Sequence, residues 1–431
     1  MFTFKLKISG YRQCASPRGQ VSSHKNQKCS EMEGIYEMKI AIKLDMSNTS
    51  SGGSHTFNSM MIDQVENYKS SEAIEIVTLL PDGNELSLKA DISLPSPWEY
   101  RLGFYKSFIR QFFYFLLKRE PISLEVCRSA ALNKLLKEHK IDFLLALQPL
   151  GTPVDIPYIT VSWDIAHRIT PYFSEISGGG RVFSSRDAIC KSVFARAYLV
   201  VVGTERGKEE IRTAYGVNPE RLKVLPFPVK EFKITNTMSR DSLAFFYPAN
   251  FWNHKNHILL LEAIKLVKED SALPVKLILT GSDKGNLEYL KGKISELELE
   301  ENIQILGFIS RDQIESIYSK VNALLFPSLV GPDNLPPLEA LASGCRVAVS
   351  DIPGARDQLG NHVDYFASNN PRELADLILK YISEPPHTYS GNPATREWIS
   401  EFSADNYLKK LLAEILSAPR AVQEIAAQNR T

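Results

Sequence analysis

The feature of this chain that most constrains its fold is a regular alternation of two kinds of segment after residue 243. One kind is short and apolar, as buried strands are, and the other has apolar residues at helical spacing. Strands and helices alternating at this length predict a parallel, doubly wound α/β sheet. The predicted strands are 244–248, 275–279, 303–306, 323–326, 346–349 and 363–366, and the predicted helices are 257–269, 287–297, 312–321 and 371–382.

An α/β pattern also precedes this region. From Met38 the sequence predicts a strand, a glycine-containing loop, a helix over 55–68 and a strand over 74–80, with later strands over 143–147, 158–161 and 198–202. A chain of 431 residues is long enough for two cores, so two Rossmann-like domains facing a central cleft are expected. The expected division is a disordered extension over 1–37, domains over 38–229 and 242–392, and a helical segment over 393–431 that packs back across the lobes.

Composition argues against several classes of partner. Lysine plus arginine and aspartate plus glutamate number 50 each, so no overall charge points to nucleic acid. The five cysteines lack the spacing of metal sites or disulfide frameworks, so reduced thiols and a cytoplasmic location are expected. Residues 1–37 lack the apolar core of a secretory signal, and a targeting peptide is the alternative to a disordered extension. The cysteines are Cys14, Cys29, Cys127, Cys190 and Cys345.

Candidate binding residues follow the carboxyl ends of the predicted strands of the second lobe. Lys255 lies between a strand and a helix, and a turn-rich loop over 331–334 precedes a short helix that begins near Leu335 and carries Glu339. In an open α/β sheet this edge holds the ligand, and a helix N-terminus with a lysine beside it suits a phosphate. The alternatives are a solvated surface lysine and an ordinary loop with a surface glutamate.

With this order of elements the chain resembles the retaining glycosyltransferases of family 4, within the glycosyl transferases group 1, which have two Rossmann-like lobes in the GT-B arrangement. The resemblance covers about residues 38–415. It implies that Lys255 holds the donor's diphosphate, with Asn250 where the family has a basic residue. It also implies that Glu339 contacts the nucleotide ribose, with Gly331 where the family has another glutamate.

The same resemblance gives the candidate site. The expected catalytic residues are His167, Lys255 and Glu339, although a lone histidine such as His167 is also compatible with a structural role. A glycine loop around Gly53 would approach the ligand from the first lobe, or would serve only as a tight turn. The expected donor-binding residues are Gly53, Asn250, Lys255, Gly281, Gly307, Phe308, Asn334, Leu335 and Glu339.

The activity implied is transfer of a sugar, with retention, from a GDP-, UDP- or dTDP-sugar to a hydroxyl of a glycan or lipid-linked acceptor, as in polysaccharide or O-antigen synthesis. Mannose on GDP is the favoured donor. No cofactor or metal is expected, and the sequence has no Asp-x-Asp motif. The alternatives left open are a nucleotide-sugar epimerase, a sugar phosphorylase and a non-catalytic scaffold that binds nucleotide or glycan.

One segment of the first lobe bears on the membrane. Residues 98–119 interleave aromatic and basic side chains, and they are too short and too charged to span a bilayer. On a helical projection the aromatic residues cover one wide arc, which predicts an interfacial helix on anionic lipid; a buried helix of the first lobe is the alternative. The interfacial interpretation gives a peripheral protein at the inner face of the membrane.

Overall fold

The computed structural model describes a large part of the chain. The described residues are 38–44, 52–68, 74–81, 91–94, 124–230, 241–271, 273–384, 393–419, 421–422 and 425. Two expectations therefore lie outside the described residues: the extension over 1–37 and the aromatic, basic segment over 98–119. In the part of the chain that is described, no helix is both long and apolar enough to cross a membrane.

The first lobe is built on a parallel sheet with the strand order β3-β2-β1-β4-β5-β6-β7. Its strands are β1 (Met38–Lys43), β2 (Ile74–Pro81), β3 (Ile92–Leu94), β4 (Phe143–Ala146), β5 (Tyr158–Val161), β6 (Leu199–Val202) and β7 (Leu222–Val224). Its helices are α1 (Gly52–Tyr68), α3 (Leu124–Glu138), α4 (Ala166–Ile169), α5 (Ser174–Ser177), α6 (Arg181–Arg196) and α7 (Glu205–Tyr215). The order reverses between β1 and β4, which is where such a sheet opens a crevice.

The second lobe has a parallel sheet with the order β10-β9-β8-β11-β12-β13. Its strands are β8 (Asp241–Pro248), β9 (Lys276–Thr280), β10 (Ile303–Gly307), β11 (Val321–Phe326), β12 (Arg346–Ser350) and β13 (Asp364–Phe366). Its helices are α8 (His257–Ser271), α9 (Leu287–Glu296), α10 (Arg311–Tyr318), α11 (Leu335–Ala342), α12 (Ala355–Leu359) and α13 (Pro371–Ser383), with a 3₁₀ turn η3 (Asn253–Lys255). The strand order reverses between β8 and β11.

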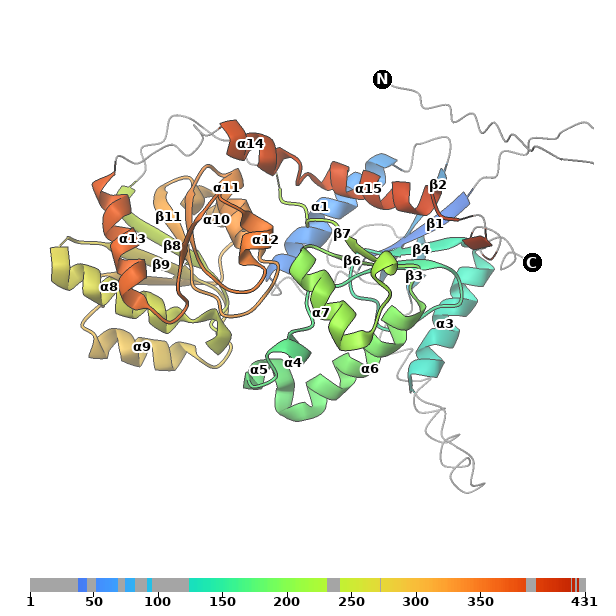
Figure 1. Cartoon of the computed structure of the whole chain (residues 1–431), viewed down its shortest axis with the longest axis horizontal. Coiled ribbons are helices and arrows are strands. Elements are labelled where there is room, and N and C mark those ends of the chain that lie inside the picture. Colours follow the sequence, from blue (N-terminus) through green and yellow to red (C-terminus); the bar gives the residue numbers. More distant parts are fainter. Residues whose placement is uncertain are drawn as a thin grey trace, which may run out of the picture. The chain divides into compact units, whose positions relative to one another are not determined.

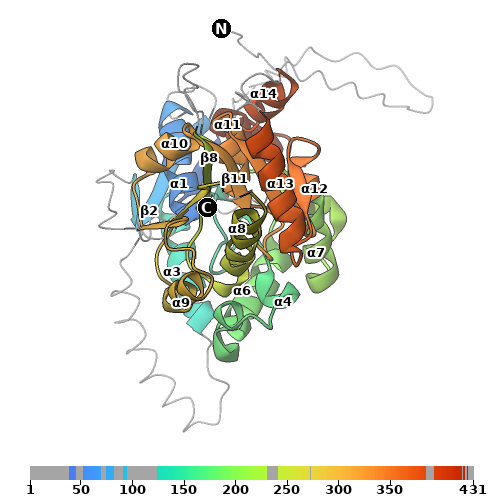
Figure 2. The same cartoon turned by 90° about the vertical axis from the view of Figure 1, so that its left-hand side faces the viewer.

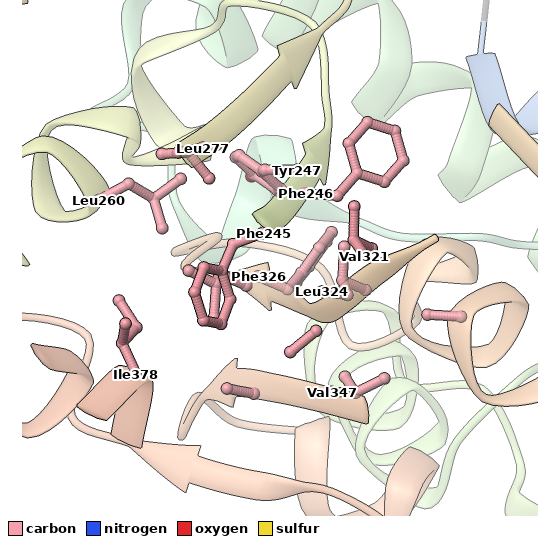
Figure 3. Close-up of a cluster of buried hydrophobic side chains, with 14 of the residues drawn as sticks. Phe245, Phe246, Tyr247, Leu260, Leu277, Val321, Leu324, Phe326, Val347 and Ile378 are labelled. Carbon is pink, nitrogen blue, oxygen red and sulfur yellow. The ribbon is translucent and has the colours of Figure 1, made fainter. Parts of the chain in front are cut away.

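The core of the second lobe explains why its strands could be predicted from the sequence. All six residues of β11 are buried, as is usual for a parallel sheet covered on both faces. In Figure 3 the aromatic side chains of β8 lie among aliphatic side chains from α8, β9 and α13, including Leu260, Leu277 and Ile378. On one face α8 and α13 lie side by side, as both views show (Figures 1 and 2).

The carboxyl-terminal residues contact both lobes. Helix α14 (Pro393–Ser400) packs against α11. Helix α15 (Ala404–Leu416) packs against α1 and lies beside it in Figure 1. Ser403 caps α15 by accepting a hydrogen bond from the amide of Asn406. The apolar stripe of α15, which includes Tyr407, Leu411 and Ile415, joins the core of the first sheet. This contact leaves the second lobe connected to the first by two crossings of the chain.

Most expected elements are present, and the differences have local causes. The fold class, with two doubly wound Rossmann-like sheets, is confirmed. Strands β3 and β7 were not predicted, because three residues at a sheet edge carry little pattern. Helix α7 was not predicted because its sequence, ERGKEEIRTAY, is mostly charged. Helix α1 begins at Gly52 and not at residue 55, so Gly53 lies in its first turn and not in a preceding loop.

Candidate active site

A cavity of about 790 Å³ lies within the residues that the structure describes, lined by both lobes. The second lobe contributes the segments that follow β8, β9, β10 and β11 at their carboxyl ends. The first lobe contributes α1, the residues after β5, and the helices α5 and α6. The strand-order reversal of the second sheet thus faces the first lobe across the cavity, which is the expected position for a ligand in α/β proteins.

Lys255 lines this cavity from the η3 turn that follows β8. The hydroxyl of Tyr247 holds the turn by donating to the carbonyl of Lys255 at 2.9 Å. The turn ends at Asn256, which has a left-handed backbone conformation with a φ of 53°. The Lys255 amino group donates to the hydroxyl of Ser328 at 3.3 Å and lies 5.7 Å from the centre of the Phe326 ring. Burial lowers the pKa of Lys255 to about 8, against an opposing effect of Asp164. Within the described part of the chain, Lys255 is thus a buried cation that forms no direct ion pair with a carboxylate.

Glu339 also lines the cavity, from the middle of α11. It is only 5% exposed, because α11 is apolar almost throughout and packs into the core. Its Oε1 accepts from Nη1 of Arg311 at 2.7 Å, and its Oε2 lies 3.4 Å from the donating hydroxyl of Tyr318. Arg311 is the first residue of α10, whose start is fixed by a capping box of Ser310 and Gln313. The structure therefore presents Glu339 as a carboxylate fixed in orientation by an arginine.

The first turn of α11 offers fewer amides than the sequence suggested. The amide of Asn334 donates to Oε1 of Gln358 at 3.0 Å, and Pro336 and Pro337 have no N–H. Leu335 supplies the remaining amide of this turn. Both Asn334 and Leu335 line the cavity as expected, but a wide row of helix N–H donors is absent from residues 334–337.

Two glycines shape the floor of the cavity beside β8. Gly281 has a φ of 147°, and a side chain there would overlap the backbone of Ala249, so the position accepts glycine alone. The amide of Gly281 donates to the carbonyl of Gly307, which has a φ of 69°. Gly281 lines the cavity, whereas Gly307 is not among the lining residues and is joined to Gly281 by this hydrogen bond.

Asn250 and Phe308 line the cavity as well. The side chain of Asn250 is used locally, since its Oδ1 accepts from the amide of Ser282 at 2.8 Å. It ties together the loops after β8 and β9. Phe308 is 58% exposed, which is unusual for a phenylalanine and places a flat apolar surface at the cavity wall.

His167 differs from the other candidates. It is fully buried in α4, its Nε2 lies 2.9 Å from the hydroxyl of Tyr215, and it is not among the residues that line the cavity. Burial lowers the pKa of His167 to about 4, so the ring is neutral at pH 7. Its catalytic role stays a prediction. Helix α1 contributes Thr56 and Phe57 to the cavity lining, and the binding role of Gly53 stays a prediction.

Several residues that line the cavity were not predicted. Asp164 follows β5, accepts from the amide of Ala166 at 2.8 Å and from Nη2 of Arg186 in α6 at 2.9 Å. Glu175 in α5 accepts from the amide of His254 at 3.0 Å and lies 2.9 Å from its Nδ1, so it joins the lobes at the cavity rim. Asp164 had a positional signal, since it follows a strand. Arg186 and Glu175 had none, because their helices place them there only through tertiary packing.

A second junction of the lobes involves Asp333, in the loop over 331–334 that precedes α11. The carboxyl of Asp333 packs so closely on Gly203, in the turn between β6 and α7, that a side chain at Gly203 would overlap it. Burial raises the pKa of Asp333 to about 8, against an opposing effect of the Gly203 amide. Nearby, the amide of Arg206 donates to Oδ2 of Asp357 at 3.0 Å. The amino end of α7 thus receives two acidic side chains of the second lobe.

The match to a known family lies in the second lobe and the helix that follows it. Residues 229–398 match the family model of glycosyl transferases group 1. The chain is 26% identical over 228 residues to the O-antigen chain mannosyltransferase RfbU of Salmonella typhimurium. That alignment covers 53% of this chain and 60% of RfbU, so the chain spans less than two thirds of the length of this curated relative.

Solved structures extend the likeness over both lobes. S. aureus TarM, solved as a mutant with fondaparinux, α-GlcNAc-glycerol and UDP, gives a TM-score of 0.62 at 14% identity, over 87% of this chain and 99% of TarM. Anabaena HepE, solved with UDP-glucose, gives 0.59 at 17% identity, over 88% of this chain and 100% of HepE. At these identities the likeness establishes the fold. Among the described residues, no group of three histidine, cysteine, aspartate or glutamate side chains could hold a metal ion.

Proposed function

From a chain with the GT-B fold whose residues 229–398 carry a glycosyl transferases group 1 domain, we propose a glycosyltransferase that uses a nucleotide diphosphate sugar. The observation that carries the proposal is that the Lys255 amino group and the Glu339 carboxylate line one cavity between the carboxyl edges of two Rossmann-like sheets. A cation suits the diphosphate of a nucleoside diphosphate, and a carboxylate suits the hydroxyls of its ribose.

Lys255 acts on the leaving group in this proposal. Negative charge grows on the departing diphosphate as the bond to the sugar breaks, and a cation already in place stabilises that charge without reorganisation. Because burial lowers the pKa of Lys255, the amino group gains more from an anionic partner than a solvated lysine would. The amide of Leu335 adds a neutral donor from the amino end of α11.

Glu339 holds the nucleotide at its ribose. An ionised carboxylate accepts hydrogen bonds from vicinal hydroxyls, and Arg311 keeps the Glu339 carboxylate oriented toward the cavity. Gly331, which has a φ of 112° and lines the cavity, leaves room for the donor sugar where a glutamate would otherwise project. Hydrogen bonds to the sugar then come from Asn334 or from the first lobe.

The finer identity of the reaction follows the relatives. We propose mannose as the favoured sugar, because the similar protein RfbU is a mannosyltransferase of O-antigen chains. Membership of family 4 and retention at the anomeric carbon are proposed from the resemblance of the sequence alone. The structure of HepE, a protein of similar fold, was solved with UDP-glucose, which supports a nucleotide sugar as the donor here. The acceptor is a glycan or lipid-linked glycan, reached by a cytoplasmic protein at the inner face of the membrane. His167 remains a candidate for the first lobe, through its neighbours Asp164 and Ala166 in the cavity wall.

Release of nucleoside diphosphate from a panel of GDP-, UDP- and dTDP-sugars tests the proposal. The wild-type protein is expected to turn over one donor in the presence of a glycan or lipid-linked acceptor, and Lys255→Ala to lower kcat by at least about tenfold. An epimerase would convert the donor without acceptor and without releasing nucleoside diphosphate. A scaffold would bind nucleotide but turn over nothing, and either result would overturn the transferase.

A further inference from the structure

In the proposed donor site, Lys255 is so far the single cation assigned to the two phosphates of the donor. Of the lysines and arginines that line the cavity in the described residues, Lys255, Arg186 and Arg311, only Lys255 stands on the diphosphate side of the second lobe. Asn250 is neutral and is engaged with Ser282. The amino end of α11 adds little, because Pro336 and Pro337 have no amides and Gln358 already binds the amide of Asn334.

Arg311 is poorly placed to add the missing charge. Its guanidinium is bound to the buried carboxylate of Glu339 at 2.7 Å and lies 3.4 Å from Oε1 of Glu315. Withdrawing it would leave Glu339 charged and 5% exposed, which is costly. Its charge is therefore committed at the ribose end of the cavity.

Arg186 has the opposite character. It lies in α6 of the first lobe, and its ion pair with Asp164 is open to solvent, with 39% of the arginine side chain and 35% of the aspartate side chain exposed. An exposed pair of this kind is weak and exchanges partners easily. Both members line the cavity, and Asp164 is near enough to Lys255 to influence it electrostatically. The Asp164 carboxylate thus pairs with Arg186 and acts electrostatically on Lys255, so an anionic ligand in the cavity would compete with it.

We propose that Arg186 is the second diphosphate-binding cation of this enzyme, supplied by the first lobe, and that the donor's phosphate oxygens replace Asp164 as its partner. This rests on the proposed function of the cavity. The planar guanidinium suits a phosphate in two-point contact, which a lysine cannot make. Because Lys255 and Arg186 belong to different lobes, the diphosphate itself joins the lobes, and donor binding favours their closure.

The test is calorimetric titration of the full-length protein, without acceptor, with GDP, UDP and dTDP and with the nucleosides guanosine, uridine and thymidine. Arg186→Gln is expected to weaken diphosphate binding by about 10- to 100-fold, the effect of one charge-assisted contact, and to leave nucleoside binding unchanged. Arg196→Gln is the matched control. Arg196 lies on the same helix, pairs with Asp155 through the same atoms at 2.8 Å, and does not line the cavity, so no change is expected.

Asp164→Asn separates phosphate binding from a purely structural pairing. If Arg186 binds phosphate, removing the competing carboxylate leaves diphosphate affinity equal or raises it, opposite to the effect of Arg186→Gln. If both variants weaken binding equally, Arg186 serves only to hold Asp164 and the proposal is overturned. Unchanged diphosphate affinity in Arg186→Gln also overturns it. In either case wild-type binding and donor turnover still stand, whereas a wild-type protein that binds no nucleoside diphosphate refutes the proposed function itself.

Discussion

At the scale of single residues, the chemistry depends on where two charged side chains are held. Lys255 is kept by the η3 turn among Tyr247, Phe326 and Ser328, in surroundings that disfavour its charge. Glu339 is kept by Arg311 and Tyr318. Both residues follow from sequence position and resemblance, but their partners do not, since all of them except Tyr247 lie more than 20 residues away along the chain.

Donor binding should depend on pH through Lys255. Its pKa in the free protein is lowered to about 8, and a bound diphosphate raises it, so binding takes up a proton above pH 8. Affinity for nucleoside diphosphate is therefore expected to be full below pH 8 and to fall about tenfold per unit above it. Calorimetry between pH 6.5 and about 9.5 measures this.

Lys255→Arg provides the control for that profile. A guanidinium stays charged throughout this range, so the fall in affinity should disappear even if the variant binds less tightly overall. A wild-type affinity that is flat up to about pH 9.5 would contradict the assignment of Lys255.

The pair of Glu339 and Arg311 should matter for stability as well as for binding. Glu339→Ala leaves a largely buried arginine without its carboxylate, and is expected to cost on the order of 3 kcal/mol in unfolding free energy. Glu296→Ala breaks an exposed pair with Lys293 in the same lobe and should cost less than about 1 kcal/mol. Urea unfolding followed by fluorescence compares the two, and equal losses would show that the Arg311 pair is not buried in solution.

At the scale of elements, the turn between β6 and α7 brings the two lobes into close contact. Gly203→Ala would push a methyl group into the carboxyl of Asp333, with an expected cost of about 1–3 kcal/mol. Adding Asp333→Ala should restore much of the loss, because it removes the atoms that clash. Gly151→Ala is the control, since nothing lies within 4 Å of the added carbon there. Thermal melting checks this, and a Gly203→Ala variant as stable as Gly151→Ala would contradict the close contact.

Elements were predictable from the sequence where burial imposes a pattern. The strands of the second lobe are apolar because helices cover both faces, so β8, β9, β11 and β12 could be placed within a few residues. Helix α7 could not, since its sequence is mostly charged, and its start is marked only by the cap of Thr204, which accepts from the amide of Gly207. The start of α1 at Gly52 was missed for a similar reason, because glycines usually predict a loop.

At the scale of the whole molecule, the site is an assembly of two sheets. The side chains of the second lobe could be predicted, because strand ends meet at one edge of a parallel sheet. On the opposite wall only Asp164 had a positional signal. Glu175 and Arg186 line the same cavity as Lys255 and His254 only because the chain packs its lobes against each other, through Glu175 on one side and Asp333 on the other.

The central claim is that this cavity holds the diphosphate of a nucleotide sugar against Lys255. Calorimetric titration of the wild-type protein and of Lys255→Gln with GDP, UDP and dTDP tests it most directly. We predict that one nucleotide binds the wild type with one-to-one stoichiometry, and that Lys255→Gln binds it at least about tenfold more weakly while its affinity for the nucleoside is unchanged. Absence of binding by all three nucleotides, or equal affinities of the two proteins, would contradict the claim.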